Sequence, residues 1–335
     1  MRLLSLLLLL CTLLPLKANP TDEILITVQK TIEREKSFSE IEETLSNLSI
    51  KELKHLSATF EKAWSPLQKN YLQNFRTYAK TQFTGSNRSA KMKRVRELRK
   101  EFHTIRQLPE GPMKSKLKEI SMPAMKELRQ ILLPNAKDLI ADAPENLKKE
   151  LQLVHGFARF RDLLQEYAVS VGAENTPSEL AASEKEIVAE YQELDRKGLR
   201  IIENNDKIAA KADLPPAERT GIRELNEWRL LVEQNALEID PKLCDAGRDH
   251  SKDMATEGFF AHISPVPGKK TPSDRAKKAG TTGGGENIYA GSTEPQGANK
   301  GWYYSPGHHK NMFNAGYKRV GLGQHNRHWT QMFGG

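Results

Sequence analysis

Apolar residues in the first two-thirds of the chain recur every three or four positions, the spacing of one face of an α-helix. The clearest run begins after Ser49 and Glu52, which match a helix-capping box. Its apolar stripe consists of Leu53, Leu56, Phe60, Trp64, Leu67 and Tyr71. A second stripe is formed by Val154, Phe157, Phe160, Leu164 and Tyr167, and a less regular third by Ile187, Tyr191, Leu194 and Ile201. This part is therefore predicted to be all-α, with prolines dividing its middle into shorter helices.

The last third has a different pattern. It holds 17 of the 22 glycines, which helix interiors avoid. Asp240-Pro241 predicts the start of a helix, and Ser305-Pro306-Gly307 predicts a helix end followed by a turn. Two alternating runs on either side of Asn326-Arg327 predict a C-terminal β-hairpin, with Val320 and Leu322 before the turn and Trp329, Gln331 and Phe333 after it.

The change in composition predicts an α+β chain with two parts. Residues 19–210 are expected to form an α-helical region, either a bundle or a coiled array. Residues 211–220, which contain Leu214-Pro215-Pro216, are expected to be the linker. Residues 221–335 are expected to form the compact domain that carries any specific chemistry.

The N-terminus has the layout of a secretory signal. The apolar run from Leu3 to Leu14 is too short to span a bilayer, and Pro15 ends it. We predict that residues 1–18 are removed after Ala18 and that the protein is secreted, either extracellular or periplasmic; an uncleaved N-terminal anchor is the alternative. No later segment is apolar enough to cross a membrane. Cys244 would then be the one remaining cysteine, so no internal disulfide is expected.

Charge patterning says little about partners. The formal net charge is +8, but lysines and arginines alternate with acidic residues and form no dense basic block. A nucleic-acid partner is therefore not expected. A weak preference for an anionic cell-surface polymer is compatible with this charge.

Histidines and one carboxylate mark the candidate site. His262 ends the segment Gly258-Phe259-Phe260-Ala261-His262, and Glu286 directly follows three glycines that let the backbone approach another group closely. His308 and His328 lie further along the chain. No phosphate-loop pattern accompanies the glycines. His250 lies on an apolar helix face and is predicted to be a core residue.

Seven segments, in this order, make the last third resemble a CAP-superfamily domain, also called the SCP domain. They read LNEWR, LCDAGRDHSKDM, GFFAHISPVPG, GENIYAG, WYYSPGHHKNM, YKRVGLG and HWTQMFG. The family includes cysteine-rich secretory proteins, venom antigen 5 and pathogenesis-related plant proteins, and the present chain is most similar in style to its bacterial members. The resemblance implies an α-β-α sandwich with a small antiparallel sheet.

The resemblance also implies a cleft lined by His262, Glu286 and His328. The animal pattern has a second glutamate on the helix after the tryptophan, where this chain reads Trp302-Tyr303-Tyr304-Ser305. His308, which bacterial relatives keep, lies just beyond. An acid has thus been exchanged for a histidine, and the chemistry of the animal site does not transfer directly.

We expect His262, Glu286 and His328 to converge, with His308 at the rim. His262 and His328 are the candidate ligands for a divalent metal, with zinc the first candidate. The favoured function is an extracellular binding or scaffold module that takes a metal, a lipid-like or sterol-like ligand, or a cell-surface polymer. The alternative is a secreted hydrolase acting on peptide, cell-wall or lipid substrates, with Glu286, His262 and His328 as catalytic candidates. Ser264 and Ser305 lie near motif histidines, but no nucleophile-elbow pattern surrounds them.

Overall fold

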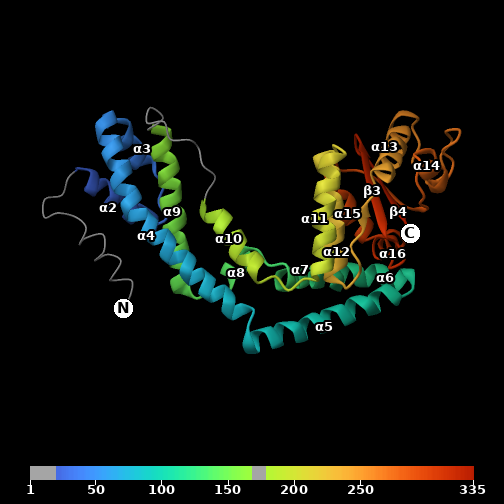
Figure 1. The fold of residues 1–335 in the computed structure, drawn as a ribbon, viewed down its shortest axis with the longest axis horizontal. Coiled ribbons are helices and arrows are strands. Elements are labelled where there is room, and N and C mark those ends of the chain that lie inside the picture. Colours follow the sequence, from blue (N-terminus) through green and yellow to red (C-terminus); the bar gives the residue numbers. More distant parts are fainter. Residues whose placement is uncertain (1–19, 168–178) are drawn as a thin grey trace. The chain divides into compact units, whose positions relative to one another are not determined.

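A computed structural model describes residues 20–167 and 179–335 (Figure 1). The predicted signal peptide, residues 1–18, lies outside the described residues. The chain divides into two compact units, each with its own apolar core. Within the described residues, unit 1 takes residues 20–88, 134–167 and 179–192, and unit 2 takes Ser89–Leu133 and Glu193–Gly335.

Unit 1 is all-α, as the apolar stripes predict. Its helices are α2 (Pro20–Glu33), α3 (Ser39–Ser46), α4 (Ile50–Gln82), α8 (Ala136–Ala141), α9 (Glu145–Tyr167) and α10 (Glu179–Glu190). The predicted capping box is present at the start of α4. Glu52 N donates to Ser49 Oγ at 3.3 Å, and Ser49 N donates to the Glu52 carboxylate at 2.8 Å.

The first two predicted stripes form the centre of this unit. The rings of Phe60 on α4 and Phe160 on α9 meet edge to face, with centroids 5.2 Å apart. The Tyr71 hydroxyl, also on α4, donates to Glu184 of α10 at 2.8 Å. Burial of the two stripes against each other is what makes α4 and α9 antiparallel neighbours.

The third stripe, predicted as one long helix, is interrupted. Helix α10 ends at Glu190, and α11 (Arg196–Lys211) begins after the Asp195 side chain accepts hydrogen bonds from Lys197 N and Gly198 N. This N-cap competes with continuation of the helix. The interruption lies where the chain passes from unit 1 to unit 2.

Unit 2 contains the sheet and most of the shorter helices. Its helices are α5 (Gly85–Gln107), α6 (Glu110–Lys116), the π-helical turn η1 (Leu117–Ser121), α7 (Met122–Leu132), α11, α12 (Pro216–Leu231), α13 (Pro241–Thr256), α14 (Pro272–Lys278), α15 (Pro295–Tyr303) and α16 (Pro306–Met312). Its strands are β1 (Glu238–Ile239), β2 (Gly285–Ala290), β3 (Arg319–His325) and β4 (His328–Gly334). The fold class is therefore α+β, as predicted.

The strands form one sheet in the order β1-β3-β4-β2. The predicted hairpin is confirmed as β3 and β4, joined at Asn326, whose φ of 52° is left-handed. Strand β2 pairs antiparallel with β4, whereas the short β1 pairs parallel with β3, so the sheet is mixed rather than antiparallel throughout. Figure 1 shows α13 on one side of this sheet and α12 and α15 on the other, an α-β-α sandwich.

Glycines bring α13 into direct contact with the sheet. A Cβ added to Gly323 of β3 would lie 1.9 Å from Arg248 N of α13, so only glycine fits there. Ser251 Oγ of α13 donates to Gly323 O at 2.9 Å and lies 2.9 Å from Thr330 Oγ1 of β4. The helix is thus fixed on the sheet face that also carries Glu286.

The predicted boundary at residues 211–220 differs from the one in the structure. Helices α5, α6, α7 and α11 belong to the same compact unit as the sheet. Leu214 is only 3% exposed, because it packs in the unit 2 core, and Pro216 starts α12 as its first residue instead of standing in a free linker. Unit 2 therefore extends the predicted domain 221–335 by two further stretches of chain.

Helix α5 holds the end of α16 in place. The Phe102 ring packs edge to face on Phe313, with centroids 5.2 Å apart, and lies 5.6 Å from the ring of His309. Arg106 donates to Phe313 O. The fully buried Arg229 of α12 donates to Met312 O at 2.6 Å. These donors satisfy carbonyl groups that the last turn of α16 would otherwise leave without partners.

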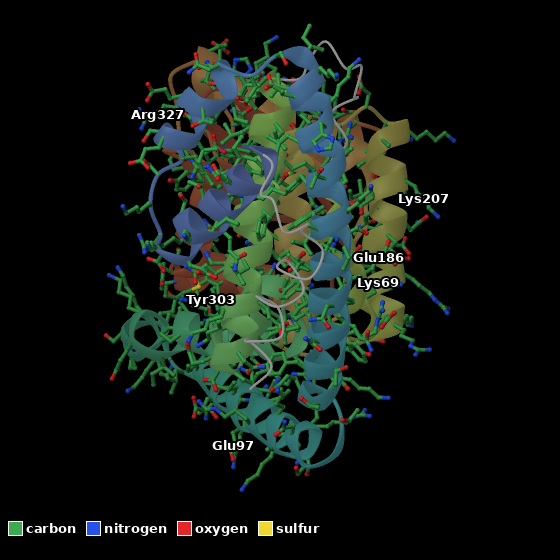
Figure 2. The ribbon with its side chains drawn as sticks, turned by 90° about the vertical axis from the view of Figure 1, so that its left-hand side faces the viewer. Lys69, Glu97, Glu186, Lys207, Tyr303 and Arg327 are labelled. Atoms are coloured by element: carbon green, nitrogen blue, oxygen red, sulfur yellow. The ribbon has the colours of Figure 1, made fainter. Side chains whose placement is uncertain are left out.

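Several charged side chains lie on the outer faces of the helices. Lys69 and Glu186 of unit 1, and Lys207 of unit 2, point away from the helix bodies (Figure 2). Within residues 20–167 and 179–335, no helix combines the length and the apolar character needed to cross a bilayer.

Replacing Phe102 by Ala should lower the free energy of unfolding of unit 2 by about 3–5 kcal/mol, because it opens a cavity between α5 and α16. In a Trp64→Phe background the remaining tryptophans, Trp228, Trp302 and Trp329, all report unit 2, so urea unfolding followed by fluorescence measures this change. Phe75→Ala, an equally buried change in unit 1, is the control and should leave that transition in place. An unchanged transition in Phe102→Ala would show that α5 unfolds separately from the sheet.

His309 should make unit 2 less stable in acid. Burial lowers the pKa of its imidazole to about 3, and Nδ1 donates to Tyr303 O at 3.0 Å. In the unfolded chain the pKa of this histidine is about 6.5, so below that pH the unfolded chain binds a proton that the folded chain does not bind. The free energy of unfolding therefore falls as pH drops from about 6.5 toward 3. At pH 5 this group should contribute a loss of about 2 kcal/mol.

Urea unfolding of the wild type and of His309→Gln at pH 7 and pH 5 isolates this contribution, because all other groups titrate in both proteins. The variant should lose less stability between the two pH values. Equal losses would mean that His309 is not the group responsible.

Candidate functional site

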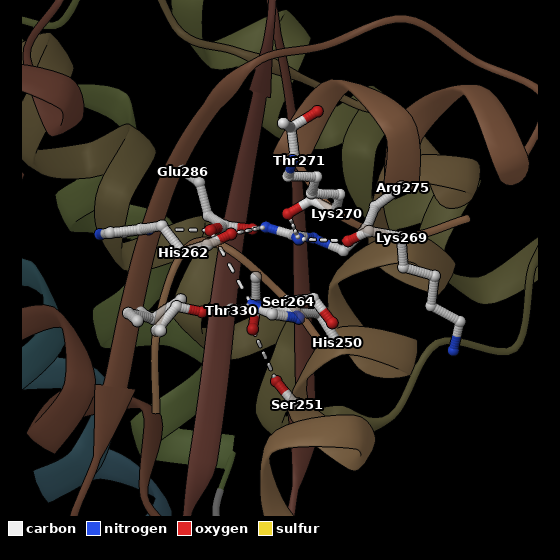
Figure 3. Close-up of polar contacts among 12 residues, drawn as sticks. His250, Ser251, His262, Ser264, Lys269, Lys270, Thr271, Arg275, Glu286 and Thr330 are labelled. Atoms are coloured by element: carbon white, nitrogen blue, oxygen red, sulfur yellow. Dashed lines mark hydrogen bonds and ion pairs between the residues drawn. The ribbon is translucent and has the colours of Figure 1, made fainter. Parts of the chain in front are cut away.

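The site is built around Glu286, the second residue of β2. Its side chain is 1% exposed, and both carboxylate oxygens have partners (Figure 3). Oε2 forms an ion pair with Arg275, and Oε1 lies 2.8 Å from Nδ1 of His262. The preceding glycines allow β2 to lie closely against its neighbours: a Cβ on Gly285 would lie 2.3 Å from the Tyr317 hydroxyl oxygen. The predicted close approach is therefore to the protein itself.

Arg275 comes from the first turns of α14. That helix begins at Pro272, after the N-cap Thr271, whose side chain forms a capping box with Asp274. The Arg275 side chain is fully buried and donates to Lys269 O at 2.9 Å and to His262 O at 3.1 Å, as well as to Glu286. One guanidinium thus joins β2, α14 and the loop that carries His262.

His262 projects from the loop after α13, and 47% of its side chain is exposed. Glu286 can only accept a hydrogen bond in its ionised form, so Nδ1 of His262 is the donor. The neutral ring then carries its free lone pair on Nε2, the nitrogen not used by Glu286. His262 and Glu286, both predicted site residues, are brought together.

His308 joins them from α16. The predicted turn at Ser305-Pro306-Gly307 is in fact the N-terminus of this helix, with Pro306 as its first residue. The ring centroids of His308 and His262 are 6.2 Å apart. Burial, and then the neighbouring His262, lowers the pKa of His308, which keeps its imidazole neutral. The site therefore presents two imidazoles side by side.

His328 lies at the other end of β2. It pairs with Ala290, whereas Glu286 pairs with Met332, four residues further along β4. Four residues of strand span about 13 Å. The ring contact of His328 is with Phe260, at 6.3 Å between centroids. The structure thus brings His262 to Glu286 and His308 to His262, whereas His328, which was expected to converge with His262 and Glu286, lies about 13 Å along the strand from Glu286.

His250 is buried as predicted, but it lies against the site. Its Nε2 donates to Ala261 O at 3.2 Å and is 4.0 Å from Glu286 Oε1, while its Nδ1 is buried without a hydrogen-bond partner. Burial lowers its pKa to about 4, so the ring is neutral at pH 7. Neither His250 nor Arg275 was predicted from the sequence to be a site residue, since His250 has the pattern of a core residue and Arg275 that of a surface charge in a lysine-rich segment.

The surroundings of His262 are partly apolar. Of the four large hydrophobic side chains exposed in the described part of the chain, two flank it in the sequence: Phe260 is 52% exposed and Ile263 55%. Ser264, the nearest candidate nucleophile, is buried, and its Oγ accepts a hydrogen bond from Val266 N at 3.1 Å. That hydroxyl therefore shapes the loop.

Within residues 20–167 and 179–335, no three His, Cys, Asp or Glu side chains are gathered as a preformed metal site. At this site, Arg275 and His262 already contact both carboxylate oxygens of Glu286. The arrangement can offer two imidazole nitrogens to a cation, or one imidazole held by a carboxylate to a polar ligand or to proton transfer.

Known proteins resemble part of the chain. It is 32% identical over 133 residues to the uncharacterized protein YkwD of Bacillus subtilis, covering 38% of this chain and 51% of that protein. It is 30% identical over 97 residues to the uncharacterized membrane protein YlbC of the same organism, covering 29% of this chain and 28% of that one. The chain thus spans about half the length of one of these relatives and less than a third of the other.

A solved structure is also similar, that of an extracellular protein containing an SCP domain from Bacillus anthracis. The identity is 29%, the TM-score is 0.32, and the match covers 35% of this chain and 40% of that one. The family model for CAP, the cysteine-rich secretory protein family, matches residues 222–333, a range that holds His262, Arg275, Glu286 and His308. Residues 222–333 of this chain are a CAP domain of the cysteine-rich secretory protein family.

Proposed function

We propose that this chain is an exported protein whose CAP domain is a binding module, and that His262 and His308 capture a divalent cation, with zinc the first candidate. The hydrogen bond from His262 Nδ1 to Glu286 carries the proposal. Histidines that bind metals almost always donate their other ring nitrogen to a carboxylate or carbonyl, which fixes the tautomer and raises the basicity of the ligating nitrogen. Glu286 occupies that supporting position.

The spacing of the two rings supports the pair. With a zinc–nitrogen distance of about 2.1 Å, two imidazoles on one ion have centroids roughly 5–6 Å apart. The centroids of His262 and His308 are 6.2 Å apart, so a small rotation of the exposed His262 brings both nitrogens to one ion. Two protein ligands leave positions for water or for a donor atom of a bound molecule.

Export is part of the proposal. The N-terminal signal pattern supports it, and the solved SCP-domain relative is described as an extracellular protein. Mass spectrometry of the mature protein should find a start near Asn19. A mature chain that keeps residues 1–16 would favour the anchored alternative.

Zinc titration by calorimetry should find one saturable site in the wild type. His262→Ala and His308→Ala should each abolish measurable binding, because each removes one of two ligands. Glu286→Gln should weaken binding about 10–100-fold by loosening the orientation of His262. Far-ultraviolet circular dichroism checks that each variant is folded.

His328→Ala is the matched control, because it removes a histidine of the same domain that lies apart from the pair. It should bind zinc within about twofold of the wild type, as expected for a change outside the coordination and supporting shells. If His328→Ala loses binding and His308→Ala keeps it, the pair predicted from the sequence, His262 and His328, is the right one. No saturable zinc binding by the wild type would end the cation proposal.

A lipid-like or sterol-like ligand is the second candidate, because Phe260 and Ile263 expose apolar surface beside His262. Binding of a fluorescent sterol or fatty acid should fall about tenfold or more for each of Phe260→Ser and Ile263→Ser, since each removes on the order of 1.5 kcal/mol of apolar burial. Ile50→Ser, an exposed isoleucine of unit 1, is the control and should have no effect. Unchanged binding in the Phe260→Ser/Ile263→Ser double variant would remove the apolar surface from the proposal.

The hydrolase remains the alternative reading of the same residues. His262, oriented by Glu286, has the geometry of a general base. Turnover of a peptide, ester or glycan substrate that falls about 10²–10⁴-fold in Glu286→Gln while binding persists would favour it.

A further inference from the structure

Arg275 is the most connected polar side chain around the site. It is 2% exposed, and its two terminal nitrogens reach the Glu286 carboxylate and the carbonyl groups of His262, Lys269 and Lys270. Figure 3 shows the guanidinium lying between Glu286 and the loop backbone. It is therefore bound both to the carboxylate that orients His262 and to the main chain of His262 itself.

Glu286 would be costly to keep in this position by itself. A carboxylate with a 1% exposed side chain has lost nearly all its water, and an unpaired buried charge is strongly destabilising. Arg275 supplies the compensating charge, and its second contact, to His262 O, fixes the distance between the carboxylate and the loop. Arg275 thus both compensates the charge of Glu286 and fixes the position of the His262 backbone.

His250 fixes the same loop from the opposite side. Its ring donates to Ala261 O, the carbonyl directly before His262, and it is held inside unit 2 at 0% exposure. Lys269, at the far end of the loop, forms ion pairs with Asp253 at 2.9 Å and Asp249 at 2.7 Å on α13. The loop is therefore fixed at several points. His250 Nε2 lies 4.0 Å from Glu286 Oε1, whereas Arg275 forms a direct ion pair with the other carboxylate oxygen.

We propose that Arg275 is a positioning residue of this site: it keeps Glu286 as the acceptor for His262 Nδ1–H, so that Nε2 of His262 is offered to the bound ligand. The inference rests on the proposed function of His262 as a cation ligand. It states that Arg275 favours the Nδ1–H tautomer of His262, which can be measured in the metal-free protein.

The test reads that tautomer directly. Ring ¹⁵N chemical shifts of His262 should show the Nδ1–H form in the metal-free wild type at pH 8. In Arg275→Gln the Nδ1–H form should lose its preference, and in Arg275→Lys, which keeps the charge but not the forked geometry, part of it should return. Zinc affinity should fall in the same order, by about 10–100-fold in Arg275→Gln.

Arg229→Lys is the matched control. Arg229 is equally buried and donates to backbone carbonyls at Asn235 and Met312, but it does not contact Glu286. The control should lose stability without a change in the His262 tautomer. A tautomer that shifts as much in Arg229→Lys as in Arg275→Lys would reduce the role of Arg275 to general stability and overturn the proposal.

Arg275→Gln alone leaves Glu286 as an uncompensated buried charge and can fail to fold. Arg275→Lys keeps the compensating charge and leaves Glu286 in place, so it reads the tautomer where Arg275→Gln does not fold. The double variant Arg275→Gln/Glu286→Gln, neutral at both positions, gives the tautomer of a folded protein without the acceptor. A wild-type tautomer in a folded Arg275 variant would overturn the inference. A shifted tautomer in a protein whose wild type binds no zinc would instead support Arg275 as the positioning residue and overturn only the cation site.

Discussion

The ion pair between Arg275 and Glu286 is the interaction on which the site depends. It places a charged carboxylate inside unit 2, where water no longer stabilises it, and the remaining oxygen then requires a donor. His262 Nδ1 is that donor, so the orientation of the exposed imidazole follows from a charge balance below the surface. The same guanidinium holds the loop backbone, so the carboxylate and the histidine it orients are positioned together.

The loop that carries His262 is held by α13, which lies directly on the sheet. Gly323 and Gly247 remove the side chains that would separate β3 from the helix. His250 of α13 then reaches the carbonyl before His262, and Asp253 reaches the buried Lys269 of the same loop. Because the backbone of α13 packs directly on that of β3, the side chains of His250 and Asp253 reach the loop and hold it. A helix at the usual distance from a sheet would not bring these side chains to the loop.

Local signals in the sequence were reliable where one contact decides the structure. The capping box at Ser49, the N-cap at Asp240 and the hairpin at Asn326 are all present. The sequence did not predict which residues far apart in the chain lie close together in the fold. His328 shares its sheet face with Glu286, but the register places it about 13 Å along the strand, while α16 brings His308 close instead. Charge and polarity alone could not separate Arg275 from the exposed lysines around it.

The extent of the domain was not predicted from the sequence for the same reason: it depends on contacts between distant parts of the chain. The family model covers residues 222–333, but α5 outside this range contacts α16. Phe102 packs on the rings of His309 and Phe313, and Arg106 donates to Phe313 O, directly after α16. Helix α16 carries His308, so a histidine inside the family match is held by side chains outside it. A helix of seven residues is too short to be stable without such contacts. The spacing of the two imidazoles consequently depends on unit 2 beyond the family match. Helix α5 is part of the structure that positions the site.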